Sequence, residues 1–182
     1  MPAADRQSPI LRLADLPARK ATRFALGPDA AGRGALAGTL GLLAIDALDF
    51  RGEIRPSGRQ DWELEATLVA EVVQPCVVTL APVATRLEET VRRRYLADYV
   101  EPEVEETEMP EDDEAEPLPA TIDLAALMAE ALALALPPYP RAEGAEFGTA
   151  AFAAPGVEPL DDEAVKPFAG LAGMIGTGPR RG

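Results

Sequence analysis

The clearest pattern in the chain is the alternation of apolar and polar residues between Trp62 and Val73. Every second residue from Trp62 is apolar, and most of the positions between them carry Glu or Thr. A period of two places one row of side chains on a buried face and the other in water. Residues 48–55 alternate in the same way, and residues 56–60 read PSGRQ, a turn sequence. The sequence therefore predicts a β-hairpin over residues 47–73.

Two segments have helical patterns. Residues 29–44 carry apolar side chains at spacings of three and four, with Asp29 as the N-cap, although four glycines weaken this helix. A second helix is predicted from Leu124, with Asp123 as its N-cap and the prolines of residues 137–140 as its end.

Residues 85–99 fit two patterns. Apolar residues recur every four positions, as in a helix, while the odd positions also suit a strand. Residues 23–26 are predicted to begin a short strand. The core is expected to rest on Leu and Val with four aromatic anchors: Phe24, Phe50, Trp62 and Tyr95.

Charge is distributed unevenly along the chain. The formal net charge is −14, from 31 acidic and 17 basic residues, and 11 of the acids fall within residues 98–116. The rest of the chain is close to neutral. Because residues 100–120 hold almost nothing to bury, they are predicted to be a mobile acidic loop.

These patterns predict an α+β protein. The expected fold is a small antiparallel β-sheet, partly barrel-like, with two to three helices packed on it. Its expected divisions are an irregular arm over residues 1–21, one domain over residues 22–140, and an extended tail over residues 141–182 with a short apolar segment at residues 166–175.

The residue types present exclude several kinds of site. With no His and one Cys, the chain cannot form the common Cys/His zinc sites, a Cys–His pair or a Ser–His–Asp triad. No glycine-rich phosphate loop follows a strand, and the carboxylates of the acidic loop lack a rigid support. We therefore expect neither enzymatic activity nor a cofactor. No apolar run reaches the ~18 residues of a membrane span and no signal peptide is recognisable, so a cytoplasmic location is expected.

Candidate binding residues lie in two places. Arg92, Arg93 and Arg94 form the single basic triplet, and clustered guanidinium groups bind phosphate; alternatively they form a solvated face paired with acids. Cys76 is expected to be a small buried hydrophobe, with Gln74 and Pro75 shaping a bend.

Three blocks of sequence carry a family resemblance. Residues 74–80 read QPCVVTL, residues 134–140 read LALPPYP at the end of the helix that follows the acidic loop, and Lys166-Pro167-Phe168-Ala169-x-Leu171 comes near the end. In this order they resemble the YceD family, the large ribosomal RNA subunit accumulation proteins. Many relatives have a C-x-x-C pair; here Val73 stands at the first Cys and Cys76 at the second, so no metal site is carried over.

The resemblance implies a non-enzymatic factor that supports the accumulation of large-subunit ribosomal RNA. It also favours a strand at residues 85–99. The expected partner is a large-subunit ribosomal RNA precursor, a ribosomal protein or an assembly factor; DNA, a membrane or a small-molecule substrate is not expected. Candidate contact residues are the arginine triplet, residues 74–76 and Phe168.

Three alternatives remain open. The acidic loop can make the protein an escort for a basic ribosomal protein. Carboxylates can support a metal-dependent phosphodiesterase. The apolar segment from Phe168 to Ile175 can dock in a partner's groove.

Overall fold

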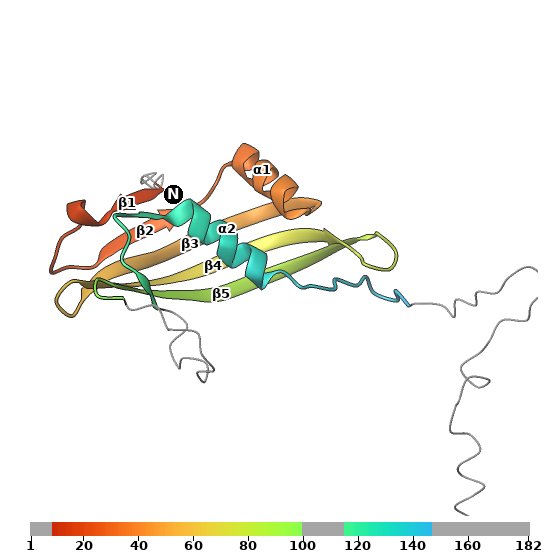
Figure 1. Cartoon of the computed structure of the whole chain (residues 1–182). Helices are drawn as coiled ribbons and strands as arrows, with labels where there is room; N and C mark the ends of the chain where they lie inside the picture. The colour runs from red at the N-terminus through yellow and green to blue at the C-terminus, as the bar shows by residue number, and fades with distance from the viewer. Residues whose placement is uncertain (1–8, 100–114, 147–182) are drawn as a thin grey trace, which may run out of the picture. The chain divides into compact units, whose positions relative to one another are not determined.

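A five-stranded sheet forms the centre of the computed structural model, which describes residues 9–99 and 115–146 (Figure 1). The chain divides into two units, Met1–Gly144 and Ala145–Gly182, and every element described here belongs to the first. The strands lie in the order β2-β3-β4-β5-β6, with β6 parallel to β5 and the other pairs antiparallel. Their bounds are β2 (Thr22–Leu26), β3 (Ala44–Ser57), β4 (Asp61–Pro75), β5 (Pro82–Leu96) and β6 (Ala115–Pro117).

Two short strands form a separate sheet. β1 (Ile10–Arg12) pairs antiparallel with β7 (Thr121–Asp123), and the 3-10 helix η1 (Leu13–Asp15) follows β1. This pairing joins the two ends of the described chain, since β7 leads directly into the last helix.

Both helices begin where the sequence predicts. α1 (Ala30–Leu40) is capped by Asp29, whose carboxylate accepts the N–H of Gly32. The helix ends earlier than predicted because Gly41, with φ 67°, adopts the left-handed conformation that terminates helices. α2 (Leu124–Ala135) is capped by Asp123, which accepts two backbone N–H groups.

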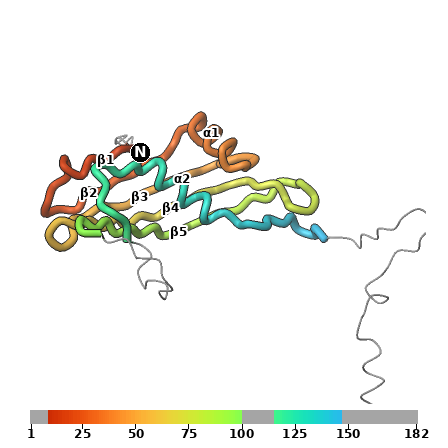
Figure 2. The backbone as a smooth tube through the Cα atoms, viewed as in Figure 1, coloured from red at the N-terminus to blue at the C-terminus, as the bar shows by residue number. Residues whose placement is uncertain are grey.

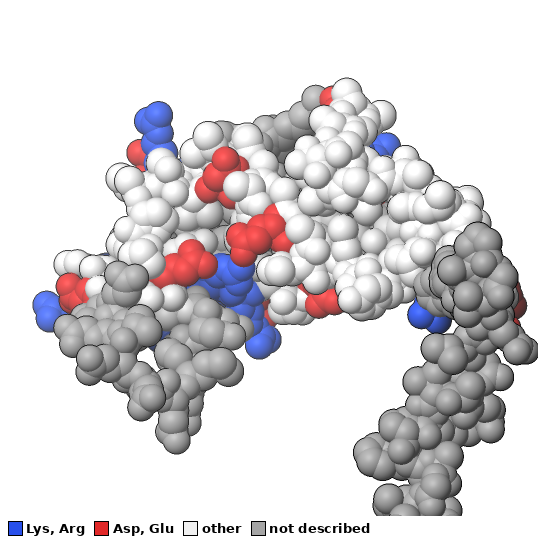
Figure 3. Space-filling model, turned by 45° about the vertical axis from the view of Figure 1, so that its right-hand side comes forward, with Lys and Arg blue, Asp and Glu red and all other residues white. Residues whose placement is uncertain are grey.

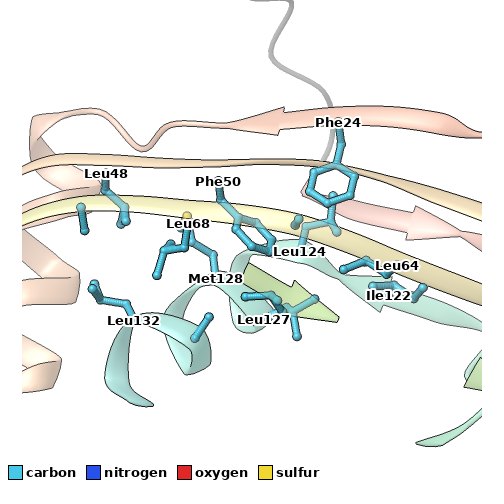
Figure 4. Packing of buried hydrophobic residues seen from close by; sticks show 14 of the residues in the cluster. Phe24, Leu48, Phe50, Leu64, Leu68, Ile122, Leu124, Leu127, Met128 and Leu132 are labelled. Atoms are coloured by element: carbon cyan, nitrogen blue, oxygen red, sulfur yellow. The ribbon is translucent and has the colours of Figure 1, made fainter. Parts of the chain in front are cut away.

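The core lies between one face of the sheet and the helices. Even-numbered residues of β4, from Trp62 to Val72, are buried, as the alternation predicts. Figure 2 shows α2 running along this sheet, and α2 contacts both β4 and β5. Figure 4 shows its apolar face against the strands, where the labelled core residues include Phe50, Leu64, Leu68, Leu124, Leu127, Met128 and Leu132. The four predicted aromatic anchors are all buried.

Residues 85–99 form a strand for most of their length, which decides between the two predictions. β5 pairs with β4 from Pro82 to Tyr95 without a break in register. The interstrand hydrogen bonds and the burial of Leu87, Val91 and Tyr95 against the core outweigh the local helical pattern.

Three expectations are corrected by the structure. The sheet is open, with no closed barrel among the described residues, because β2 and β6 are its two edges. Part of the arm expected to be irregular forms β1 and η1, and part of the acidic loop expected over residues 100–120 forms β6. Both strands are only three residues long and are set by partners distant in sequence, so local patterns do not reveal them. The acidic residues 100–114 lie outside the described residues.

Gly52 allows β3 and β4 to approach closely at the centre of the sheet. A Cβ placed at Gly52 would lie 2.6 Å from the Cβ of Ala66 and closer still to the backbone oxygen of Glu65. Phe24 of β2 is the register partner of Gly52 on its other side. The lack of a side chain at Gly52 therefore lets β3 lie close to β4, while Phe24 of β2 pairs with Gly52 on the other side.

We expect Gly52→Ala to lower the free energy of unfolding by about 1–3 kcal/mol, the cost of overpacking a close-packed core. The matched control is Gly38→Ala on the exposed side of α1, where a new Cβ meets no atom within 4 Å. That change should raise stability by up to about 1 kcal/mol through helix propensity. Urea denaturation of both variants checks the pair, and equal effects would contradict the close-approach argument.

Candidate functional site

The face of the sheet opposite the helices is rich in charge, and we call it the open face. It carries the odd-numbered residues of β4, such as Glu63 and Glu65, and their register partners on β3 and β5. The charged side chains whose strand positions fall on this face are Arg23, Asp49, Arg51, Glu53, Arg55, Asp61, Glu63, Glu65, Glu71, Arg86, Glu88, Arg92 and Arg94. Every basic residue among them is an arginine.

Ion pairs hold most of these arginines across neighbouring strands. Arg55 lies 2.8 Å from Glu63, Arg86 3.1 Å from Glu71, and Arg92 3.5 Å from Glu65. Hydrogen bonds from Arg55 and Ser57 lower the pKa of Glu63. Exposed pairs of this kind contribute about 0–1 kcal/mol each, so they orient the guanidinium groups without binding them tightly.

The arginine triplet is divided between the two faces of β5. Successive residues of a strand point to opposite sides, so Arg92 and Arg94 lie on the open face and Arg93 on the helix face. Arg93 has only 20% of its side chain exposed and reaches Glu116 at 2.9 Å and Glu130 at 2.7 Å. Arg93 thereby links β5 to Glu116 of β6 and to Glu130 of α2. The three arginine side chains therefore lie on two faces of the sheet, and their contact with a partner stays a prediction.

A shallow hollow of about 330 Å³ lies at the end of the open face near the start of β4. Arg55, Arg92 and Arg94 line it together with Glu63 and Glu65, and Leu64 and Arg93, which lie between them on β4 and β5, border it as well. Sequence reasoning selected the triplet but missed Arg55. The alternation of residues 48–55 places Arg55 on the polar row of the predicted hairpin, so its position on the open face could have been predicted from the sequence.

The predicted residues 74–76 lie at the opposite end of the sheet. Gln74 is buried and its Nε2 donates to the carbonyl of Pro137 at 3.1 Å, while Pro75 is the last residue of β4. Cys76 is fully buried, as expected of a small apolar side chain. None of these three lies with the arginines, and Phe168 falls outside the described residues.

The Cys76 sulfur accepts hydrogen bonds in the turn that follows. The N–H groups of Val78 and Thr79 point to its Sγ at 3.4 Å. Hydrogen bonding from the backbone of Ala142, then from the hydroxyl of Thr79, and to a smaller extent from these two N–H groups lowers the pKa of the thiol to about 6. The described residues contain no group of three His, Cys, Asp or Glu side chains able to hold a metal ion. Neither described helix is long and apolar enough to cross a membrane.

Comparison with known proteins gives one match. A family model described as "Large ribosomal RNA subunit accumulation protein YceD" matches residues 64–174, which is more than half of the chain and confirms the resemblance. No curated protein and no solved structure matches.

We expect Arg93→Met to destabilise the fold more than Arg92→Met. Arg93 loses two carboxylate contacts in a largely buried position, so its effect should lie between the ~0.5 kcal/mol of an exposed pair and the ~3 kcal/mol of a buried one. Arg92→Met should change the free energy of unfolding by no more than about 1 kcal/mol. Denaturant titration compares them, and equal values would contradict the division of the triplet.

Cys76 should make stability depend on pH. Its folded pKa of about 6 lies below the ordinary value of 9.0, so the unfolded chain holds more protons between these values. The thiolate's contribution is absent below pH 6, grows as pH rises, and is complete above pH 9. A serine at position 76 does not ionise between pH 6 and pH 9. We therefore expect the difference in urea midpoint between wild type and Cys76→Ser to grow from pH 6 to pH 9. A constant gap would show that the thiol does not ionise in the fold.

Proposed function

The chain belongs to the YceD family, and on that premise we propose that it supports accumulation of large-subunit ribosomal RNA by binding the RNA precursor through its open face. The observation that carries this proposal is the hollow in which Arg55, Arg92 and Arg94 converge. The protein acts as a binding factor rather than an enzyme, and this role places it in the cytoplasm.

Arginine is suited to this task by its shape. The planar guanidinium group offers paired N–H donors that match two oxygens of a phosphate. On the open face, carboxylates pair with Arg55 and Arg92 before any ligand arrives. Since each exposed pair is weak, a phosphate can replace a carboxylate at small cost. The exposed face of the sheet gives the RNA backbone room to lie across several strands.

The mixture of charges on the open face also limits binding. Glu63 and Glu65 lie among the arginines that line the hollow. A duplex or strand that does not bring phosphates into register with the arginines meets these carboxylates instead, and like charges repel. The proposed contact is therefore modest in strength, sensitive to salt, and dependent on the shape of the RNA.

We expect the double variant Arg92→Gln, Arg94→Gln to bind large-subunit precursor RNA at least tenfold more weakly. Each lost phosphate contact should also lower the salt slope by about 0.7–0.9. Gln avoids placing new acids opposite Glu63 and Glu65, and Arg93 is left intact to preserve the fold. Filter binding across a salt series measures both quantities.

The matched control is Arg86→Gln, which removes an arginine from the same face and strand but outside the hollow. Unchanged affinity in the double variant, or an equal loss in the control, would refute the proposed site. If wild-type protein instead migrates free of precursors in a gradient and carries one basic ribosomal protein, the escort hypothesis replaces RNA binding.

A further inference from the structure

Three segments without charged residues meet at the end of the sheet away from the hollow. They are residues 34–45, 72–85 and 136–140, in a chain of which 26% is charged. Hydrogen bonds bring them together: Leu43 donates its N–H to Val73, and Val77 donates to Pro140 at 2.9 Å. We call the surface they form the apolar end. The view in Figure 3 shows charged side chains gathered on one side and a mostly uncharged surface on the other.

Large apolar side chains project into solvent at the apolar end. Leu43, Val77, Leu80 and Tyr139 are all exposed, and they make up four of the six exposed large hydrophobic residues among those described. Leu80 and Tyr139 are each 76% exposed. Large apolar side chains gathered at one end of a protein are typical of a surface where another molecule binds.

The backbone conformation of Leu80 is a second, independent observation that its side chain has a role. It has φ 61° and is the single non-glycine residue with positive φ among those described. A leucine costs energy in this conformation, which glycine or asparagine adopts readily. The turn between β3 and β4 has Gly58 at φ 56°. The turn after β4 has leucine instead, although the N–H of Leu80 donates to the backbone oxygen of Cys76, a hydrogen bond that needs no leucine side chain.

Packing inside the molecule does not explain this leucine, because three quarters of it is in water. The turn is nevertheless held firmly. Gln74 and Val77 are hydrogen-bonded to the segment that follows α2, and the buried Cys76 sulfur accepts two backbone N–H groups. Leu80 is therefore presented on a rigid support, as a preformed anchor for a partner.

We propose that the apolar end docks into an uncharged apolar pocket on a protein of the large-subunit precursor, with Leu80 as the anchor. The absence of charge selects this partner over RNA, since the three segments offer no basic group to neutralise phosphate. Tyr139 is the one aromatic side chain in these segments, so at most one base can stack there. The choice of a large-subunit protein rests on the proposed function, whereas the apolar anchor itself does not.

The test uses purified precursor particles and, in parallel, the same RNA stripped of protein. Leu80→Gly should bind particles at least tenfold more weakly than wild type, and the loss should persist in high salt because apolar contacts are not screened. It should bind the stripped RNA as wild type does. Its melting temperature should be unchanged or higher, since glycine removes the strain. Leu80→Asn, which also tolerates this conformation, should behave in the same way.

Leu134→Ala is the matched control. This leucine is 77% exposed but lies on α2 beside the middle of β5. Equal binding of particles by wild type and Leu80→Gly would overturn the inference, as would an equal loss in Leu134→Ala. A dimer of wild type that Leu80→Gly abolishes in sedimentation would also overturn it, by assigning the surface to a second copy.

The two proposals fail in different ways. If wild type binds particles through Leu80 but does not bind stripped RNA, the docking inference stands and the RNA-binding proposal falls. If wild type binds stripped RNA and Leu80→Gly binds particles equally well, the reverse holds. Binding to neither preparation would overturn both.

Discussion

The register of β4 is the constraint on which the rest of the molecule depends. This strand lies between β3 and β5 and is paired along nearly its whole length on both sides. Because its side chains alternate strictly, a slip of one residue would put Glu63 or Glu65 in the place of Leu64 in the core. The same register determines which arginines meet which carboxylates on the open face. Core and surface are thus specified by one alignment.

Much of this arrangement follows from local sequence. Alternation predicts the β3–β4 hairpin and its buried row, and a capping carboxylate before an apolar helical pattern predicts both helix starts. What local sequence does not decide is which of two compatible patterns a segment adopts. At β5 both patterns were present, and pairing with β4 settled the outcome. β1 and β6 are too short to leave any periodic signal.

Local sequence also fails to predict which side chains of the candidate site lie together. Three adjacent arginines suggest one positive cluster, yet a strand places its middle residue on the other face. Arg93 then has a structural role, fixed by Glu130, which comes 37 residues later. Arg55 joins Arg92 and Arg94 through pairing across β4, although it is distant from them in sequence. Assigning function to such residues requires the strand alignment as well as the residue types.

The parallel pairing of β5 with β6 fixes the two points of the sheet between which the acidic loop runs. Ala115 lies opposite Arg94, Leu118 donates its N–H to Leu96, and Ala97 donates to Asp61. The chain therefore leaves the sheet and rejoins it at neighbouring points, and these anchors are fixed by the body alone. Closing a longer segment between fixed ends costs only about 0.6 kcal/mol for each doubling of its length. The length of the acidic insertion is thus nearly free to vary in evolution while the sheet, the hollow and the apolar end stay the same.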